Sequence, residues 1–292
     1  MTHDIKNVGV AGAGTMGAGI AIVAARAGFK TCVFDTRQSI VDRAQQQTAD
    51  FLAKSVKRGK LQPEQMQQAL ANWSGTTRLE DFADSDIVIE AIYEDLGAKV
   101  RLFADLNPVC APHCLFASNT STISITELAG GSGRPGQFVG MHFCLPAQLM
   151  RLVEMSAGLT THADSFARAW EFCLALGQQP VHTQDTPGFI LNYFLIPFNN
   201  DAIRLVEEGV AEAGEIDAAI KGALGYPMGP LELLDLVGLD TQRLLCDALS
   251  GLTHEPRATC PALVKRMIAA GRTGKKAGRG FHSYSDSKIF GA

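Results

Sequence analysis

Short apolar runs alternate with longer amphipathic stretches through the first two thirds of the chain. Runs of this length, separated by stretches with helical periodicity, indicate buried parallel strands joined by helices. The runs lie at 8–12, 31–35, 86–92, 114–118 and 138–143. This alternation predicts an α/β fold with a Rossmann-like, mostly parallel sheet.

The pattern changes at about residue 186, where the strand signals stop and helical periodicity continues to the last quarter of the sequence. We therefore predict a sheet domain over residues 1–185, with a long helical insertion at about 38–73. Residues 186–292 are predicted to form an all-helical domain. Helical domains with broad apolar faces commonly pair about a two-fold axis, so we expect a homodimer through this domain.

A glycine-rich turn follows the first predicted strand, with the sequence Gly12-Ala13-Gly14-Thr15-Met16-Gly17. The first glycine permits a tight turn, the second lets a pyrophosphate approach the backbone, and the third allows close packing of helix and strand. Asp35 ends the next predicted strand, where its carboxylate suits the hydroxyls of an adenine ribose and disfavours a 2′-phosphate. The motif predicts NAD binding, and the alternative is a glycine-rich turn without a ligand.

Composition excludes several other classes of protein. The net charge of −4 provides no polybasic face for nucleic acid, and the apolar runs are too short to span a membrane. The amino-terminal segment has no apolar signal sequence, and the seven cysteines are scattered. We therefore expect a cytoplasmic protein without disulfides. No cluster of residues has the spacing of metal ligands, so no metal is expected.

Polar residues gather where the predicted strands end. Ala91, Glu94, Asn119, Ser121 and His142 lie at or just past such ends, the edge where doubly wound sheets bind ligands. His142 and Glu154 are embedded in the apolar segments 138–143 and 152–155. An imidazole oriented by a carboxylate can serve as a general base near neutral pH. A structural histidine–glutamate pair is the alternative.

Three features of the sequence allow two interpretations each. Lys57 and Arg58 belong to the main basic cluster outside the tail, which either binds an anionic group or forms a solvated helix face. Asn192 begins a strongly apolar helical segment, and its amide either is buried in the core or faces an interdomain cleft. The basic, glycine-rich segment 271–281 is either a flexible end or a loop folded toward the cofactor.

At this point the chain resembles the short-chain L-3-hydroxyacyl-CoA dehydrogenases over nearly its whole length. The matching motifs, in the family's order, are GAGTMGAGIA at 12–21, IEAIYEDLGAK at 89–99, SNTSTISI at 118–125, HF-x-x-P at 142–146 with LVE at 152–154, TPGFILN at 186–192, YPMGPLELLDLVGLD at 226–240 and GKKAGRGF at 274–281. The resemblance implies NAD-linked oxidation of a 3-hydroxyacyl thioester, in fatty acid metabolism, by a Rossmann-like domain and a helical dimerisation domain.

The resemblance also implies roles for individual residues. His142 is the catalytic base, Glu154 orients it, and Ser121 and Asn192 contact the thioester side of the substrate. Glu94, Lys99 and Ser121 lie along the ribose and nicotinamide of NAD, with Lys276 reaching in from the tail. Lys57 and Arg58 match the region that holds the phosphates of coenzyme A.

Two positions depart from the family's pattern. Leu145 replaces the asparagine of the usual HFFNP run, and Tyr193 stands where an arginine commonly follows Asn192. Leucine can neither donate nor accept a hydrogen bond, so one polar contact is lost near the reacting centre. These changes favour a hydrophobic or ring-like acyl group, or a lower turnover rate.

Two other functions remain open on the sequence. A dehydrogenase on the same scaffold could act on a free 3-hydroxy acid, in which case Lys57 and Arg58 would not affect substrate affinity. A protein that binds NAD(H) without catalysis, as a structural component or sensor, would show binding but no turnover.

Overall fold

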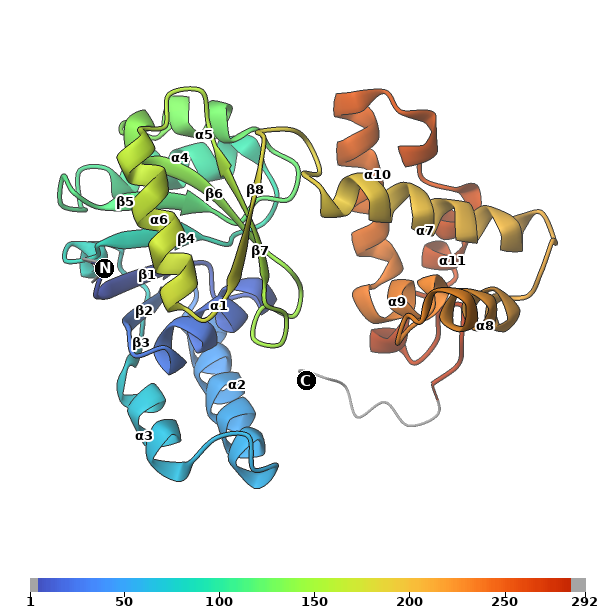
Figure 1. The fold of residues 1–292 in the computed structure, drawn as a ribbon, viewed down its shortest axis with the longest axis horizontal. Helices are drawn as coiled ribbons and strands as arrows, with labels where there is room; N and C mark the ends of the chain where they lie inside the picture. Colours follow the sequence, from blue (N-terminus) through green and yellow to red (C-terminus); the bar gives the residue numbers. More distant parts are fainter. Residues whose placement is uncertain (1–4, 285–292) are drawn as a thin grey trace. The chain divides into compact units, whose positions relative to one another are not determined.

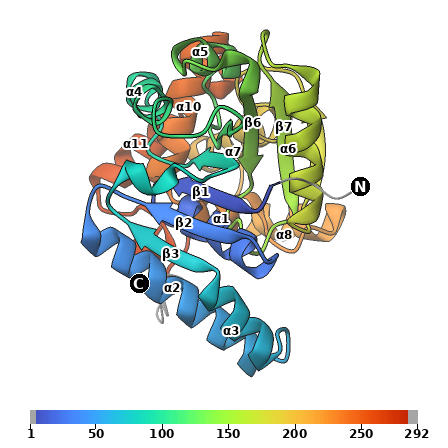
Figure 2. The same ribbon diagram turned by 90° about the vertical axis from the view of Figure 1, so that its left-hand side faces the viewer.

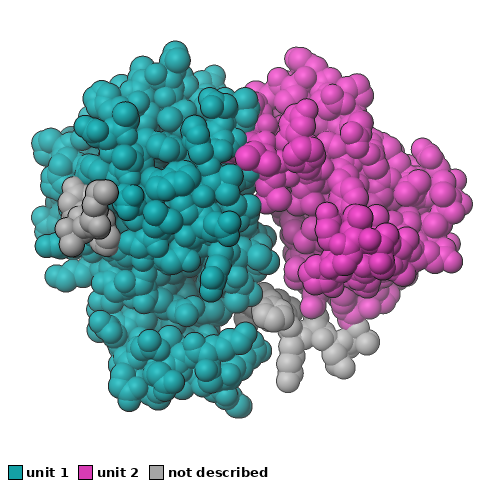
Figure 3. Space-filling view, viewed as in Figure 1, with its two compact units in different colours: residues 1–186 teal, residues 187–292 magenta. Residues whose placement is uncertain are grey.

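The computed structural model of the protein describes residues 5–284. The chain divides into two compact units, Met1–Thr186 and Pro187–Ala292, which are coloured separately in Figure 3. The first unit is built on one sheet and the second on helices, in agreement with the fold class predicted from the sequence.

The first unit contains an eight-stranded sheet with the order β3-β2-β1-β4-β5-β6-β7-β8. The strands are β1 (Asn7–Ala11), β2 (Lys30–Phe34), β3 (Trp73–Thr76), β4 (Ile87–Glu90), β5 (Leu115–Ser118), β6 (Phe138–Phe143), β7 (Leu152–Ala157) and β8 (Gln179–Thr183). Strands β1 to β6 are parallel, β7 is antiparallel to β6, and β8 is parallel to β7. The predicted mostly parallel sheet is therefore confirmed.

The insertion predicted at about 38–73 is helical except at its end. It contains α2 (Gln38–Lys57) and α3 (Pro63–Ala71), and Gly59 between them has a φ of 67°. Trp73, however, is the first residue of β3, which pairs with β2 at the edge of the sheet (Figure 2). The prediction was wrong there because the four-residue segment WSGT contains a glycine and shows no apolar run; its pairing with β2 is what makes it a strand.

Helices cover both faces of the sheet (Figure 1). Helices α1 (Thr15–Arg26) and α6 (Ala163–Ala175) pack with the strands in the largest apolar core. Helices α4 (Leu96–Leu106) and α5 (Ile125–Gly131) pack on the other face, where Phe103 lies edge-on against Phe138. Because side chains alternate along a strand, Met141 enters the first core and its neighbour His142 points to the α4–α5 face.

The second unit is formed by the helices α7 (Leu191–Glu207), α8 (Ala213–Leu224), α9 (Pro230–Val237), α10 (Leu239–Thr253) and α11 (Ala262–Ala269). They enclose a separate apolar core that includes Ile203, Leu231 and Val264, each fully buried. Single turns of 3₁₀ helix occur in the two units at Leu79–Phe82, Pro135–Gln137, Pro256–Ala258 and Lys275–Ala277. Within residues 5–284, no helix combines the length and apolarity that crossing a bilayer requires.

The glycine-rich tail is folded against α9. The backbone N–H groups of Phe281 and His282 each donate to the buried Asp235 carboxylate at 2.8 Å. A side chain at Gly280 would collide with the same carboxylate, since an added Cβ would lie 1.7 Å from its Oδ1. The described part of the tail is therefore folded onto the helical unit, and its proximity to the cofactor stays a prediction.

Candidate active site

His142 and Glu154 lie directly opposite each other on the antiparallel strands β6 and β7. Directly opposed residues project to the same face with their Cβ atoms close together, so this register brings the two side chains into contact. His142 Nδ1 lies 2.8 Å from Glu154 Oε2, and the two residues are only 6% and 1% exposed. The carboxylate therefore fixes one ring nitrogen, and the second nitrogen is left for chemistry.

Ser121 approaches that second nitrogen from the loop after β5. Its Oγ lies 3.1 Å from His142 Nε2. With Nδ1–H donating to the carboxylate, Nε2 carries the lone pair and can accept a proton from a hydroxyl. The structure thus brings together His142, Glu154 and Ser121, three of the four catalytic residues expected from the sequence.

Glu94 holds the Ser121 loop in place. One oxygen of Glu94, Oε1, accepts from the backbone N–H of Ser121 at 2.8 Å and from Thr122 N–H at 3.1 Å. The Thr120 hydroxyl donates to the same oxygen at 2.6 Å. Asn119, at the start of this loop, accepts from Phe143 N–H through Oδ1 at 2.8 Å and so ties the loop to the strand of His142.

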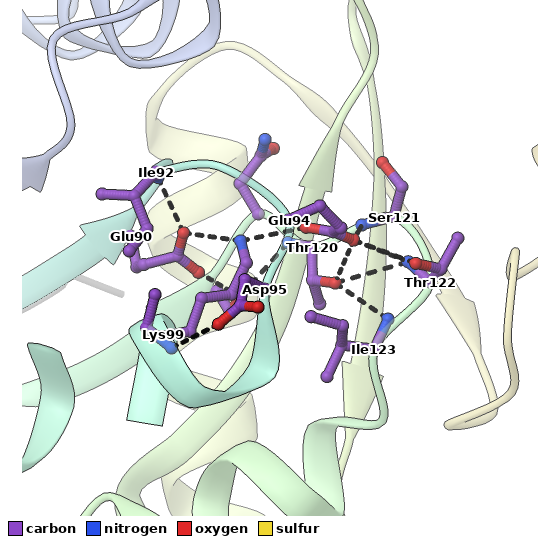
Figure 4. A network of polar contacts seen from close by, with 12 residues as sticks. Glu90, Ile92, Glu94, Asp95, Lys99, Thr120, Ser121, Thr122 and Ile123 are labelled. Carbon is purple, nitrogen blue, oxygen red and sulfur yellow. Dashed lines mark hydrogen bonds and ion pairs between the residues drawn. The ribbon is translucent and has the colours of Figure 1, made fainter. Parts of the chain in front are cut away.

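A buried lysine lies between two carboxylates behind this loop (Figure 4). Lys99 Nζ is 2.6 Å from Glu90 Oε1 and 3.1 Å from Glu94 Oε2. The pKa of Glu90 is raised above its usual value, because the effect of burial exceeds the opposing effects of the Lys99 charge and of the hydrogen bonds that Glu90 accepts. Burial also acts to raise the pKa of Glu94, but the Lys99 charge and the donors of the loop hold it below its usual value. Burial would lower the pKa of Lys99, and the two carboxylates raise it above its usual value.

Sequence reasoning did not single out Glu90 or Ser118. Ser118 Oγ donates to Glu90 Oε2 at 2.5 Å, and both residues are fully buried at the ends of adjacent strands. The sequence did contain a signal for this pair, because an acidic residue and a hydroxyl residue each end an apolar run. Burying either without a hydrogen-bond partner would cost free energy, so the two could be expected to pair.

The glycine turn has the form that a dinucleotide requires. Gly12 has a φ of 111°, and an added Cβ would lie 2.6 Å from the carbonyl oxygen of Ala91. At Gly17 an added Cβ would lie 1.7 Å from the carbonyl oxygen of Gly12, whereas at Gly14 it would meet no atom within 4 Å. The glycines at 12 and 17 are therefore needed for folding, and the one at 14 leaves open space above the backbone.

The surroundings of this turn also suit phosphate and ribose groups. Helix α1 begins at Thr15, and its N-cap residue Gly14 makes no side-chain cap hydrogen bond, which leaves N–H groups and the positive end of the helix dipole available. Met16 lies in the same first turn and is partly buried. Asp35 accepts from Ala13 N–H through Oδ2 at 3.2 Å, so its carboxylate borders the turn. The residues present therefore fit NAD.

The remaining expected site residues belong to other elements of the fold. Lys57 and Arg58 are exposed at the C-terminal end of α2, and Leu145 is 42% exposed in the loop between β6 and β7. Asn192 and Lys276 belong to the second unit. Asn192 is 7% exposed in the first turn of α7, and Lys276 Nζ lies 2.6 Å from Asp240 Oδ1.

Comparisons with known proteins assign both units. Residues 7–186 match the family model described as 3-hydroxyacyl-CoA dehydrogenase, NAD binding domain, and residues 188–284 match the C-terminal domain of the same family. The chain belongs to the 3-hydroxyacyl-CoA dehydrogenase family. It is therefore an oxidoreductase with NAD as its cofactor.

Similar proteins align with nearly the whole of this chain. A 3-hydroxybutyryl-CoA dehydrogenase from Mycobacterium tuberculosis is 41% identical over 286 residues, which span 97% of this chain and 100% of that protein. A 3-hydroxyadipyl-CoA dehydrogenase from Escherichia coli is 40% identical over 97% of this chain but only 60% of its own length. The crystal structure of (S)-3-hydroxybutyryl-CoA dehydrogenase from Ralstonia eutropha superposes with a TM-score of 0.90 at 37% identity, covering 97% of this chain and 100% of that one.

Proposed function

We propose that the protein oxidises an L-3-hydroxyacyl-CoA to the 3-ketoacyl-CoA, with His142 as the base. The observation that carries this proposal is the buried His142–Glu154 pair, whose second ring nitrogen faces Ser121 Oγ at 3.1 Å. Family membership and the names of the relatives support the substrate class. They also argue against the non-catalytic alternative.

The residues of the site divide the chemistry between them. His142 Nε2 takes the proton of the 3-hydroxyl group, and Glu154 stabilises the imidazolium that forms. The Ser121 hydroxyl, already directed at this nitrogen, orients the substrate oxygen, and Asn192 is proposed to contact the thioester side. NAD, when bound by the glycine turn and Asp35, supplies the hydride acceptor.

The decisive experiment follows the oxidation of NADH during reduction of 3-ketoacyl-CoA substrates of graded length. We expect turnover with at least one thioester and turnover roughly 10²- to 10⁴-fold slower after His142→Gln, with circular dichroism showing that both proteins are folded. If every thioester is inert while a free 3-keto acid is reduced, the enzyme is instead the free-acid dehydrogenase.

The basic cluster at the end of α2 separates the same two possibilities. We propose that Lys57 and Arg58, both exposed, pair with the phosphates of coenzyme A. Replacing both by alanine should then raise KM for acetoacetyl-CoA about tenfold and leave KM for a pantetheine thioester unchanged. If the KM for acetoacetyl-CoA is the same in the variant as in the parent, Lys57 and Arg58 do not bind coenzyme A, and this result would favour the free acid as the substrate class.

Leu145 is proposed to select the acyl group. Its side chain is 42% exposed three residues after His142, in a loop that also exposes Leu149 and Met150. These apolar side chains favour a bulky or ring-like acyl group near the reacting centre. We expect Leu145→Asn to raise kcat/KM for short straight-chain substrates and to lower it for ring-bearing ones. A uniform change across the substrates would remove Leu145 as a determinant of specificity.

We further propose a homodimer formed by the helical unit, residing in the cytoplasm. Phe194, Val210 and Leu244 of this unit are each at least 60% exposed, which is costly for apolar side chains without a partner. All seven cysteines are free thiols, as expected in a reducing compartment. Sedimentation measurements of the protein and of the Leu244→Glu variant test the dimer.

A further inference from the structure

The ammonium group of Lys99 is enclosed within the first unit. Its residue is 1% exposed, and its nitrogen contacts carboxylates on two sides, at 2.6 Å and 3.1 Å. An ammonium group has three donors, and these contacts use two of them. Glu94, in contrast, has 34% of its side chain exposed and lies between the lysine and the Ser121 loop. Lys99 is thus placed to act on Glu94.

We propose that Lys99 is a positioning residue: its charge holds Glu94 in place, and Glu94 in turn fixes the loop that directs the Ser121 hydroxyl at His142. This assignment rests on the proposed function, in which Ser121 orients the substrate oxygen. It differs from the role that family resemblance implied, a contact between Lys99 and the cofactor.

The chain of contacts is continuous. Lys99 binds Glu94 through Oε2, and Glu94 uses Oε1 to accept the Ser121 and Thr122 backbone N–H groups and the hydroxyls of Thr120 and Thr122. Ser121 Oγ then meets His142 Nε2. Figure 4 shows the part of this chain from Glu90 and Lys99 through Glu94 to Thr122. A shift of the Glu94 carboxylate would release several donors of one loop at once.

The lysine is needed because two carboxylates share the same region. Glu90 is fully buried, and both it and Glu94 contact the single ammonium group of Lys99. Without that cation, like charges in a medium of low dielectric cannot both remain ionised, and one carboxylate must take up a proton or move. In either case Glu94 loses acceptor strength or position, and the Ser121 loop relaxes.

The test is a double-mutant cycle between Lys99→Met and Ser121→Ala. Lys99→Met should lower kcat roughly 10- to 100-fold, the usual effect of a small misplacement of a reacting group. The dissociation constant for NADH, measured by fluorescence, should stay within about twofold of the parent value. In the Ser121→Ala background the same change should lower kcat by less than about threefold, because the route through Ser121 is already lost.

Two additional variants keep the test interpretable. Removing Lys99 alone leaves the buried Glu90 carboxylate beside the partly exposed Glu94 carboxylate without a cation, so Glu90→Gln with Lys99→Met provides a version that balances the charge and is expected to fold. Arg101→Met, an exposed site two residues along α4, is the matched control and should leave kcat unchanged. An equal loss in this control would assign the effect to the helix and overturn the proposal.

A readout without turnover separates this inference from the proposed function. The ring nitrogen chemical shifts of His142, assigned by comparison with His142→Gln, should change in Lys99→Met in the same direction as in Ser121→Ala. Inert thioesters with the parent protein would refute the proposed function and leave this comparison valid. The inference itself fails if Lys99→Met leaves those shifts unchanged, if the two losses in kcat multiply, or if NADH binding weakens about tenfold with kcat intact.

Discussion

Each unit of the molecule contains a histidine paired with a buried carboxylate, and the two pairs have nearly the same length. His142 lies 2.8 Å from Glu154 in the sheet unit, and His282 lies 2.7 Å from Asp217 in the helical unit. Glu154 and Asp217 are each only 1% exposed. By distance and by burial of the acid alone, either pair could be taken for a catalytic base with its orienting acid.

Their surroundings differ. Asp217 also accepts the backbone N–H groups of Leu231 at 2.8 Å and Glu232 at 3.1 Å, so it caps the first turn of α9. The other pair stands next to the carboxyl edge of a parallel sheet, with a serine hydroxyl at the second nitrogen of the ring. The group facing the second ring nitrogen, rather than the ring–acid distance, distinguishes a base from a structural contact.

The largest expected effect separates the two histidines directly. His142→Gln should lower kcat roughly 10²- to 10⁴-fold, because the proton acceptor is lost. His282→Gln should leave kcat within about threefold and lower the midpoint of thermal unfolding, because it removes a contact that ties the tail to α8. Steady-state kinetics and scanning calorimetry on both variants provide the measurements. A comparable loss of kcat in the two variants would end the distinction.

The two acids should differ in the same way, with a smaller effect on rate. Glu154→Gln should lower kcat on the order of 10²-fold, because an amide neither holds the required tautomer nor stabilises the imidazolium. Asp217→Asn should instead cost about 1 kcal/mol of unfolding free energy, because an amide keeps only one of the two oxygens that accept N–H groups of α9. Denaturant titrations give the second quantity, and an Asp217→Asn protein with unaltered stability would contradict the capping role.

These contrasts show what the sequence could and could not supply. The glycine turn and Asp35 were predictable because they depend on local spacing, and residues 12–35 form a continuous turn, helix and strand. The pairing of His142 with Glu154 could be inferred from two apolar strands joined by a short loop. His282 and Asp217 are 65 residues apart, and only the packing of the tail on α8 and α9 brings them together.

Lys99 illustrates the same limit within the active site. The family resemblance implied that Lys99, the last residue of the motif at 89–99, lies along the ribose and nicotinamide of NAD. Its burial depends on Glu90 and Glu94, which approach it only when α4 packs on the sheet. A local pattern identifies the residues of a site, and the roles of buried charges follow from tertiary contacts.

A third prediction concerns acid sensitivity, for which each unit provides one glutamate. The pKa of Glu94 is held below its usual value by Lys99 and loop donors against the effect of burial, and that of Glu232 by hydrogen bonds from Lys221 and Gly229 N–H. A lowered pKa contributes stability above the unfolded value, near pH ~4.3, which is lost as pH falls through the folded value. Stability measured between pH ~3 and 6 should therefore fall less steeply in Glu94→Gln and Glu232→Gln than in the parent.

Salt should distinguish these two glutamates. The Lys221–Glu232 pair is 37% and 33% exposed, so 1 M salt, with a Debye length of about 3 Å, should screen most of its contribution. Glu94 is exposed to a similar degree, at 34%, but its partner Lys99 is enclosed at 1%, so the contribution of Glu94 should persist at the same ionic strength. Equal salt sensitivity of the two variants would mean that solvent reaches the Lys99 site.

The smallest effect tests whether Glu154 carries a charge. Burial, reinforced by Glu154, raises the pKa of the Cys144 thiol to about 11. Only the thiolate is alkylated, so iodoacetamide should modify Cys144 slowly at pH ~8, and Glu154→Gln should accelerate the reaction about two- to threefold. Asp217→Asn should leave the rate unchanged, and the partly exposed Cys32 on β2 serves as a reference thiol in every sample. If Glu154→Gln and the parent react at the same rate, Glu154 is uncharged in the resting protein, and His142 lacks the anion that its role as a base requires.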